Sequence, residues 1–140
     1  HNFKAFHHVK LSFGYNLEVG DNVVVHRHVL LDDRGGISLG DGASVSDFAN
    51  VYSHSHDVVE GRDITTPVTV IEAGVRVTYH ATVMSGVRLA EGSMLGAFAV
   101  ATKDTEPHGI YAGIPARKIK DKPGTSGRPP TPDPLADVEG

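Results

Sequence analysis

Histidine is the residue type that stands out first, because 9 of the 140 residues are histidine. A neutral imidazole, with a reference pKa near ~6.5, can take a proton from a hydroxyl group or bind a metal ion. Two histidines lie in the segment Ser53-His54-Ser55-His56-Asp57. The pair Asp32-Asp33 offers carboxylate oxygens, which accept strong hydrogen bonds from sugar hydroxyls. These two segments are the first candidates for a functional site.

A cluster of basic residues near the C-terminal end could bind phosphate groups. Cations are needed wherever phosphate is bound, and 4 of the 13 basic residues fall close together. They are Arg117, Lys118, Lys120 and Lys122. Small residues at 96–97 and at Ala99 would allow an extended ligand to lie close to the backbone. The alternative is a solvated basic segment without a ligand.

Composition excludes several classes of function. The formal net charge is −4, so the chain has no electrostatic footprint for nucleic acid or an anionic membrane. The absence of cysteine excludes disulfides, thiolate catalysis and Cys-ligated zinc. No signal peptide and no apolar run near the ~20 residues of a membrane span are visible. We therefore expect a cytoplasmic protein.

The elements that must position these residues are short, because apolar residues recur with a period of six. This period fits neither a helix of 3.6 residues per turn nor a long alternating strand, so it predicts very short strands joined by tight corners. The anchors of the period are Phe13, Val19, Val25, Leu31, Leu39, Val45, Val51, Ile71, Val77, Val83, Leu89, Leu95 and Ala101. A second small or aliphatic residue follows four positions after the anchors, as Leu17, Val23, Val29, Ala43, Ala49, Val75, Ala81, Val87, Ser93 and Ala99.

Glycine, Asn and Asp residues mark the corners between these strands. They cluster at 20–22, 40–42 and 91–92, where they can supply positive φ angles. Three faces per coil make about 18 residues, so the regular chain predicts an all-β parallel β-helix of roughly four to five coils. The alternative is a chance rhythm in a Val-rich sandwich, which a dozen anchors in near-perfect phase argue against.

Two departures from the period define the organisation of the chain. A two-residue excess falls at 32–36, and an irregular loop runs over 56–67. Loops that leave a rigid coil are where binding groups usually lie. We expect four parts. They are a lead-in or remnant of a longer chain over 1–12, the repeat domain over 13–106, a cap over 107–122, and an extended tail over 123–140 that holds five of the eight prolines.

Hexads of the form Leu/Ile/Val-Gly-x-x-Ala/Ser/Val-x resemble those of the hexapeptide-repeat acyltransferases, whose fold is a left-handed parallel β-helix. Three further segments resemble the maltose, galactoside and nodulation O-acetyltransferase branch and its polysaccharide-modifying relatives. They are Ser53-His54-Ser55-His56-Asp57, Val100-Ala101-Thr102-Lys103-Asp104 and the stretch from Tyr111 to Lys120. The resemblance covers about residues 13–120.

The resemblance implies a CoA-dependent O-acetyltransferase that acts on a carbohydrate or related small acceptor. His56 would be the general base, and the acceptor hydroxyl would attack the acetyl carbonyl directly, without an acyl-enzyme. Acceptor contacts would come from Asp33, Asp32, His54 and His26. Acetyl-CoA, as co-substrate, would be bound by Tyr79, Ala97, Thr102, Lys103, Arg117 and Lys120. The branch carries an Asn shortly before the Asp pair that this chain lacks, so the acceptor stays unidentified.

The resemblance further implies a homotrimer with active sites between subunits, and three alternatives stay open. Transfer to an amine such as an aminosugar would use the same residues. A metal hydratase of the gamma carbonic anhydrase type would need His26, His54 and His80, but the further histidine of that pattern is Ser85 here. We therefore expect no metal. The third alternative is a non-catalytic trimeric scaffold.

Overall fold

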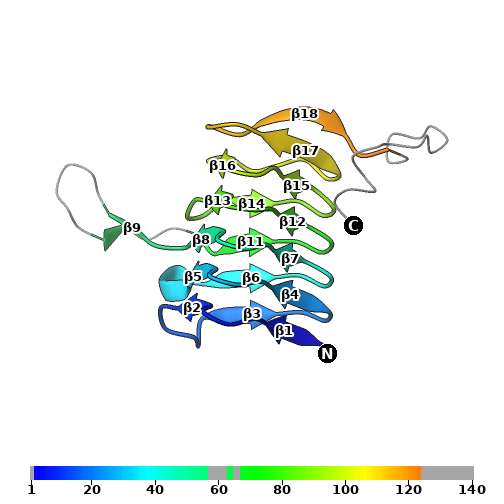
Figure 1. Cartoon of the computed structure of the whole chain (residues 1–140). Coiled ribbons are helices and arrows are strands. Elements are labelled where there is room, and N and C mark those ends of the chain that lie inside the picture. The colour runs from blue at the N-terminus through cyan, green and yellow to red at the C-terminus, as the bar shows by residue number, and fades with distance from the viewer. Residues whose placement is uncertain (1, 57–62, 65–66, 124–140) are drawn as a thin grey trace.

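The computed structural model describes residues 2–56, 63–64 and 67–123. The chain winds as a parallel β-helix of about five coils, stacked from the N-terminal to the C-terminal end (Figure 1). The expected all-β β-helix is therefore confirmed. The described residues contain no α-helix, hence none long and apolar enough to span a membrane, and one 3-10 turn, η1 (Asp33–Gly35).

Three sheets form the faces of the coil, and their strands are parallel except for the last pair of the seven-stranded sheet. The seven-stranded sheet runs in the order β1 (Phe3–Ala5), β4 (Val23–Val25), β7 (Ser44–Val45), β12 (Arg76–Val77), β15 (Met94–Leu95), β17 (Gly109–Ala112) and β18 (Arg117–Asp121). The five-stranded sheet has β16 (Val100–Ala101), β13 (Thr82–Val83), β8 (Asn50–Tyr52), β5 (Leu30–Asp32) and β2 (Lys10–Leu11). The four-stranded sheet has β14 (Arg88–Leu89), β11 (Thr69–Ile71), β6 (Ile37–Leu39) and β3 (Leu17–Val19).

The core is a set of aliphatic columns, because each inward side chain lies over its equivalent in the next coil. In the seven-stranded sheet, Val25 pairs with Val45, Val45 with Val77, and Val77 with Leu95. These four residues are at most 1% exposed. Of the expected anchors, all those from Val25 onward are buried, which confirms the six-residue period as the source of the core.

The prediction that Phe13 is the first buried anchor is wrong. Its side chain is 49% exposed, and Leu11 takes the corresponding place by pairing with Leu31. The next anchor, Val19, follows Leu11 by eight residues, because the first coil carries the same two-residue excess as the second. Strands β1 and β2 pair with β4 and β5, so the first coil begins before the expected boundary at residue 13.

The C-terminal end of the solenoid is closed by a hairpin. Strand β17 pairs in parallel with β15, and β18 then returns antiparallel to β17. All five residues of β18 are exposed, so this strand forms the outer edge of the cap at the top of the stack (Figure 1). The Pro-rich tail expected over 123–140 lies outside the described residues except for Pro123.

Three corners join the sheets, and we name them by their content. The aromatic corner joins the seven- and five-stranded sheets and comprises residues 6–9, 26–29, 46–49, 78–81 and 96–99. The loop corner joins the five- and four-stranded sheets and comprises the described residues of 12–16, 33–36, 53–68, 84–87 and 102–104. The glycine corner joins the four- and seven-stranded sheets and comprises residues 20–22, 40–43, 72–75, 90–93 and 106–108.

The glycine corner has the positive φ angles that the sequence predicts. Asn22, Gly42 and Gly92 all have positive φ, between 58° and 71°. The aromatic corner also has positive φ in every coil, but without glycine. Its residues form a stacked ladder, with centroids 4.7–4.9 Å apart and interplanar angles of 4–8°, in the order His8, His28, Phe48, His80, Phe98. Ring stacking between coils offsets part of the backbone strain that a side chain suffers there.

The close approach of successive coils at the glycine corner gives a stability test. A Cβ added at Gly40 would lie 2.6 Å from the amide nitrogen of Ala73, whereas one at Gly42 would meet nothing nearer than 4.0 Å. We expect Gly40→Ala to lower the free energy of unfolding by about 2 kcal/mol, because backbone must move. Gly42→Ala should cost only about 1 kcal/mol, from its positive φ. Denaturant titration measures the free energy of unfolding of both variants. If Gly40→Ala lost no more of it than Gly42→Ala, the described register between successive coils would be contradicted.

Candidate functional site

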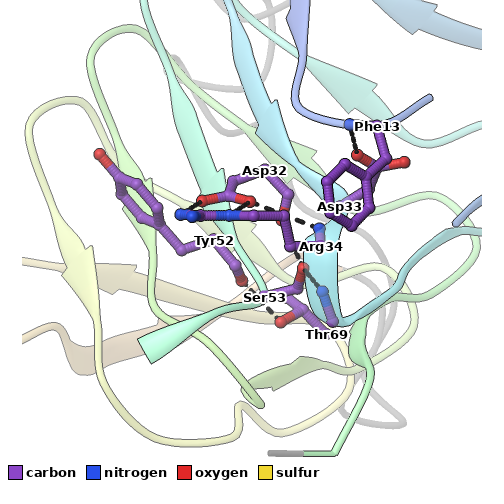
Figure 2. Close-up of polar contacts among 8 residues, drawn as sticks. Phe13, Asp32, Asp33, Arg34, Tyr52, Ser53 and Thr69 are labelled. Atoms are coloured by element: carbon purple, nitrogen blue, oxygen red, sulfur yellow. Dashed lines mark hydrogen bonds and ion pairs between the residues drawn. The ribbon is translucent and has the colours of Figure 1, made fainter. Parts of the chain in front are cut away.

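The second of the two aspartates, Asp33, is buried within the loop corner and binds the backbone of the neighbouring coil. The Asp33 side chain is fully buried, and its carboxylate accepts three backbone hydrogen bonds from the first coil (Figure 2 draws the first of them). The donors are the amides of Phe13 at 2.8 Å, Gly14 at 2.9 Å and Asn16 at 3.1 Å. Asp33 therefore shapes the neighbouring loop, and these contacts do not present its carboxylate to an acceptor.

The first aspartate is paired with an arginine that the sequence analysis did not single out. Asp32 is 4% exposed and accepts two hydrogen bonds from the Arg34 guanidinium, at 2.9 and 2.7 Å (Figure 2). This contact holds the pKa of Asp32 below its ordinary value, against the effect of burial. The order Asp-Asp-Arg-Gly-Gly contains the pair, but only the 3-10 turn brings both side chains together.

Two buried hydroxyls hold the ends of the extruded loop. Ser53 donates to the carbonyl of Asp32 and accepts a bond from the Gly35 amide at 3.0 Å. Thr69, where the chain re-enters the coil, donates to the carbonyl of Tyr52 at 2.6 Å (Figure 2). The loop therefore starts and ends at fixed points on the coil.

The expected catalytic histidine lies on this extruded loop. Strand β9 (Ser55–His56) pairs antiparallel with β10 (Asp63–Ile64), with His56 opposite Asp63, and β9 stands well out from the coil (Figure 1). The His56 side chain and most of the expected 56–67 loop lie outside the described residues. His54 is half-buried at the base of the loop and has a partner.

A hollow of about 330 Å³ lies beside the Asp32–Arg34 pair. Its lining combines an aromatic ring, an amide, a carboxylate and a guanidinium, and it comprises Tyr15, Asn16, Glu18, Arg34, Gly35, Gly36, Ile37 and Val68. The Tyr15 side chain is 77% exposed and stacks on Phe13, with ring centroids 5.2 Å apart. This mixture of a flat apolar ring and hydrogen-bonding groups can bind a polyhydroxylated molecule.

A second hollow, of about 320 Å³, lies below the C-terminal cap, where cations expected to bind phosphate meet. Lys103 and Arg117 both line it, and within the described residues neither forms an ion pair. Lys118 lines it too, but its ammonium is 2.7 Å from both Glu106 and Asp121, and these carboxylates raise its pKa. Lys103 and Arg117 are therefore the two available cations.

The other residues expected to bind acetyl-CoA divide between two regions. Exposed Thr102 lies next to Lys103 on the loop corner, and Lys120 lies on the exposed strand β18. Tyr79 and Ala97 lie instead on the aromatic corner, where Tyr79 is 45% exposed and contacts the ladder edge-on. Within one chain, Tyr79 and Ala97 therefore lie on a different corner from Thr102 and Lys103.

The histidines considered for a metal hydratase do not converge. His26 and His80 lie on the aromatic corner, where His26 stacks on Phe6 and His80 lies between Phe48 and Phe98. His54 lies on the loop corner. Among the described residues, these three form no group that could hold a metal ion. The expected acceptor contact from His26 likewise lies on a different corner from Asp32 and Asp33.

The ion pair between the buried Asp32 and the exposed Arg34 predicts a dependence of stability on pH. Because the pKa of Asp32 is lowered in the folded state, its contribution is complete above the unfolded pKa near ~4 and is lost as the pH falls through the folded value. We expect Asp32→Asn to lower the free energy of unfolding by about 1–2 kcal/mol at pH 7, and this difference should shrink as the pH falls below the unfolded pKa of Asp32.

Asp47→Asn is the matched control, because Asp47 pairs with Arg27 at 3.0 Å but its side chain is 26% exposed, against 5% for Asp32. Its effect should be smaller. Denaturant titrations across the pH range measure both variants. If Asp32→Asn lowers the free energy of unfolding by the same amount at every pH, the ionised Asp32–Arg34 contact is not the source of the stability.

Comparison with known proteins relates the chain to acetyltransferases. No protein-family model matches it. A provisionally named acetyltransferase of Staphylococcus aureus is 30% identical over 114 residues, 78% of this chain. The galactoside O-acetyltransferase of Escherichia coli is 26% identical over 118 residues, 81% of this chain. The chain spans only 57% and 58% of the length of these two relatives.

Solved structures of the same kind share the fold. A maltose O-acetyltransferase from Clostridium difficile aligns with a TM-score of 0.80 and 23% identity, covering 86% of this chain and 66% of that one. A galactoside acetyltransferase in complex with coenzyme A also has a TM-score of 0.80, with 21% identity, covering 94% and 70%. The chain is therefore similar in sequence and repeat to hexapeptide-repeat acetyltransferases, a galactoside O-acetyltransferase among them, and the solved maltose and galactoside acetyltransferases show that it shares their fold.

Proposed function

We propose that this chain transfers an acetyl group from acetyl-CoA to a hydroxyl of a carbohydrate or related small acceptor. The observation that carries the proposal is the hollow below the cap, where Lys103 and Arg117 are cations without an ion pair in the described structure. Phosphate oxygens are the natural partners of such cations. A related acetyltransferase was solved in complex with coenzyme A, which supports the same ligand here.

In this proposal, coenzyme A lies between two copies of the chain. Its phosphates contact Lys103 and Arg117, with Thr102 and Lys120 nearby, and its pantetheine arm passes Ala97 and Tyr79. Thr102 and Lys103 lie on the loop corner, and Ala97 and Tyr79 lie on the aromatic corner, so we expect a neighbouring copy to supply the aromatic corner. A homotrimer, with three equivalent sites between subunits, meets this need. It would also cover the exposed rings of Phe48 and Phe98.

We assign the role of general base to His56 on strand β9. Its imidazole takes the proton from the acceptor hydroxyl as the oxygen bonds to the acetyl carbon and the carbon–sulfur bond breaks. Coenzyme A leaves as the thiol, and the product is the acetyl ester. No cysteine is present to form an acyl-enzyme, and direct transfer needs none.

For the acceptor, the contacts favour the hollow beside Arg34 over direct binding by the two aspartates. Tyr15 offers a ring face for a sugar, and Arg34 and Asn16 offer hydrogen bonds. Asp32 and Asp33 then act as positioning residues, because they hold Arg34 and the 13–16 loop. This departs from the sequence-based expectation that both aspartates contact the acceptor themselves.

Binding of acetyl-CoA can be tested without knowing the acceptor. Calorimetry at moderate salt should give saturable binding with one site per chain. Lys103→Ala should weaken it about tenfold, the loss of one charge-assisted contact. The matched control is Lys10→Ala, since Lys10 is exposed on β2 at the opposite end of the solenoid. Absence of saturable binding, or equal effects of the two variants, would contradict the proposal.

The role of His56 is tested by the release of coenzyme A thiol with a panel of carbohydrate acceptors. We expect His56→Ala to lower kcat by about 10²–10⁴-fold, the usual contribution of a general base. Its affinity for acetyl-CoA should stay unchanged. His108→Gln is the control, because His108 lies on the glycine corner, away from both hollows. Full activity of His56→Ala in the intact oligomer would exclude it as the base.

A further inference from the structure

The N-terminal end of the aromatic ladder holds a histidine cluster that the proposed reaction does not use. His8 and His28 are stacked neighbours in the first and second coils, and His7 meets both rings edge-on, with centroids 5.1 and 6.2 Å away. One ring nitrogen from each of the three lies within 4.8 Å of the other two. All three residues are exposed.

These imidazoles are not committed to other polar partners. Within the described residues, none of the three donates or accepts a side-chain hydrogen bond, and none is part of an ion pair. Their ring contacts are with each other and, for His28, with Phe48. Ring nitrogens in this situation have lone pairs available to a ligand from solution.

We propose that His7, His8 and His28 bind one divalent transition-metal ion of the zinc class. Imidazole nitrogen suits Zn²⁺, Co²⁺, Ni²⁺ and Cu²⁺, whereas Mg²⁺ and Ca²⁺ prefer oxygen ligands, which this cluster lacks. Three protein ligands would leave further coordination positions to water. The site is distinct from the His26, His54 and His80 set, and it does not depend on the proposed acetyl transfer.

Binding requires the rings to turn. A zinc ion lies about 2.0–2.1 Å from each imidazole nitrogen and in the plane of each ring, so the lone pairs of the parallel His8 and His28 rings converge on one ion only after a ring rotates. Both side chains are exposed and can rotate without disturbing the aliphatic core. The backbone need not move, because the corners of adjacent coils already bring the three residues together. The ion would then tie the first coil to the second.

The ladder supplies a matched pair of variants. Phe48 and Phe98 already occupy the ladder position in other coils, so phenylalanine preserves the stack at this corner. His28→Phe therefore removes one ligand and keeps the ladder. His80→Phe makes the same chemical change two coils further on and leaves all three ligands in place.

The test is titration of the full, chelator-treated chain with CoCl₂, followed by visible absorption, and with ZnCl₂, followed by calorimetry and thermal unfolding. We expect one ion per chain and a higher Tm with zinc for the wild type and His80→Phe. His28→Phe should bind at least about tenfold more weakly and lose the shift in Tm. Circular dichroism of the metal-free variants checks that both are folded.

Three results would overturn the proposal. The first is the absence of saturable binding to the wild type. The second is equal affinity for the wild type and His28→Phe. The third is a loss of binding in folded His80→Phe as large as that in His28→Phe. None of them bears on acetyl-CoA binding, so the failure of this proposal and the failure of the proposed function can be told apart.

Discussion

The register between coils is the constraint on which the rest of the structure depends. Every coil must donate and accept backbone hydrogen bonds with the next, as Gly20 does with Leu39 and Gly40 with Ile71. The same face position therefore returns directly above itself, and additional residues can leave the stack only at a corner. This is why the aliphatic core forms columns, why rings stack in a ladder and why the insertions of the first three coils all lie at a corner, here the loop corner (Figure 1).

Most of the fold follows from the sequence, because a six-residue period leaves few alternatives once twelve anchors agree. The failure at Phe13 has a physical cause: two insertions of equal length in successive coils keep those coils in register, so the first is invisible to a search for one period. The ladder was missed because aromatic residues are unusual at positive φ. Its signal was present, since His28, His80 and Phe98 each lie three residues after an anchor.

The site could be predicted as a set of residue types but not as an arrangement. Sequence reasoning found Lys103 and Arg117, which do meet at one hollow. It could not find that Asp33 faces inward to three amides, because those donors come from a different coil. Nor could it show that Tyr79 and Lys103 lie on different corners, because residues only a few positions apart within the repeat belong to different corners. That separation is the basis on which we propose that copies of the chain assemble around the ligand.

In the function proposed above, two corners from two copies of the chain form one coenzyme A site. A crystal structure of the full chain with bound acetyl-CoA tests it most directly. We expect the phosphates to lie beside Lys103 and Arg117 of one copy and the pantetheine arm to lie along Ala97 and Tyr79 of its neighbour. A coenzyme contacting a single copy only, or bound away from the hollow below the cap, would contradict it.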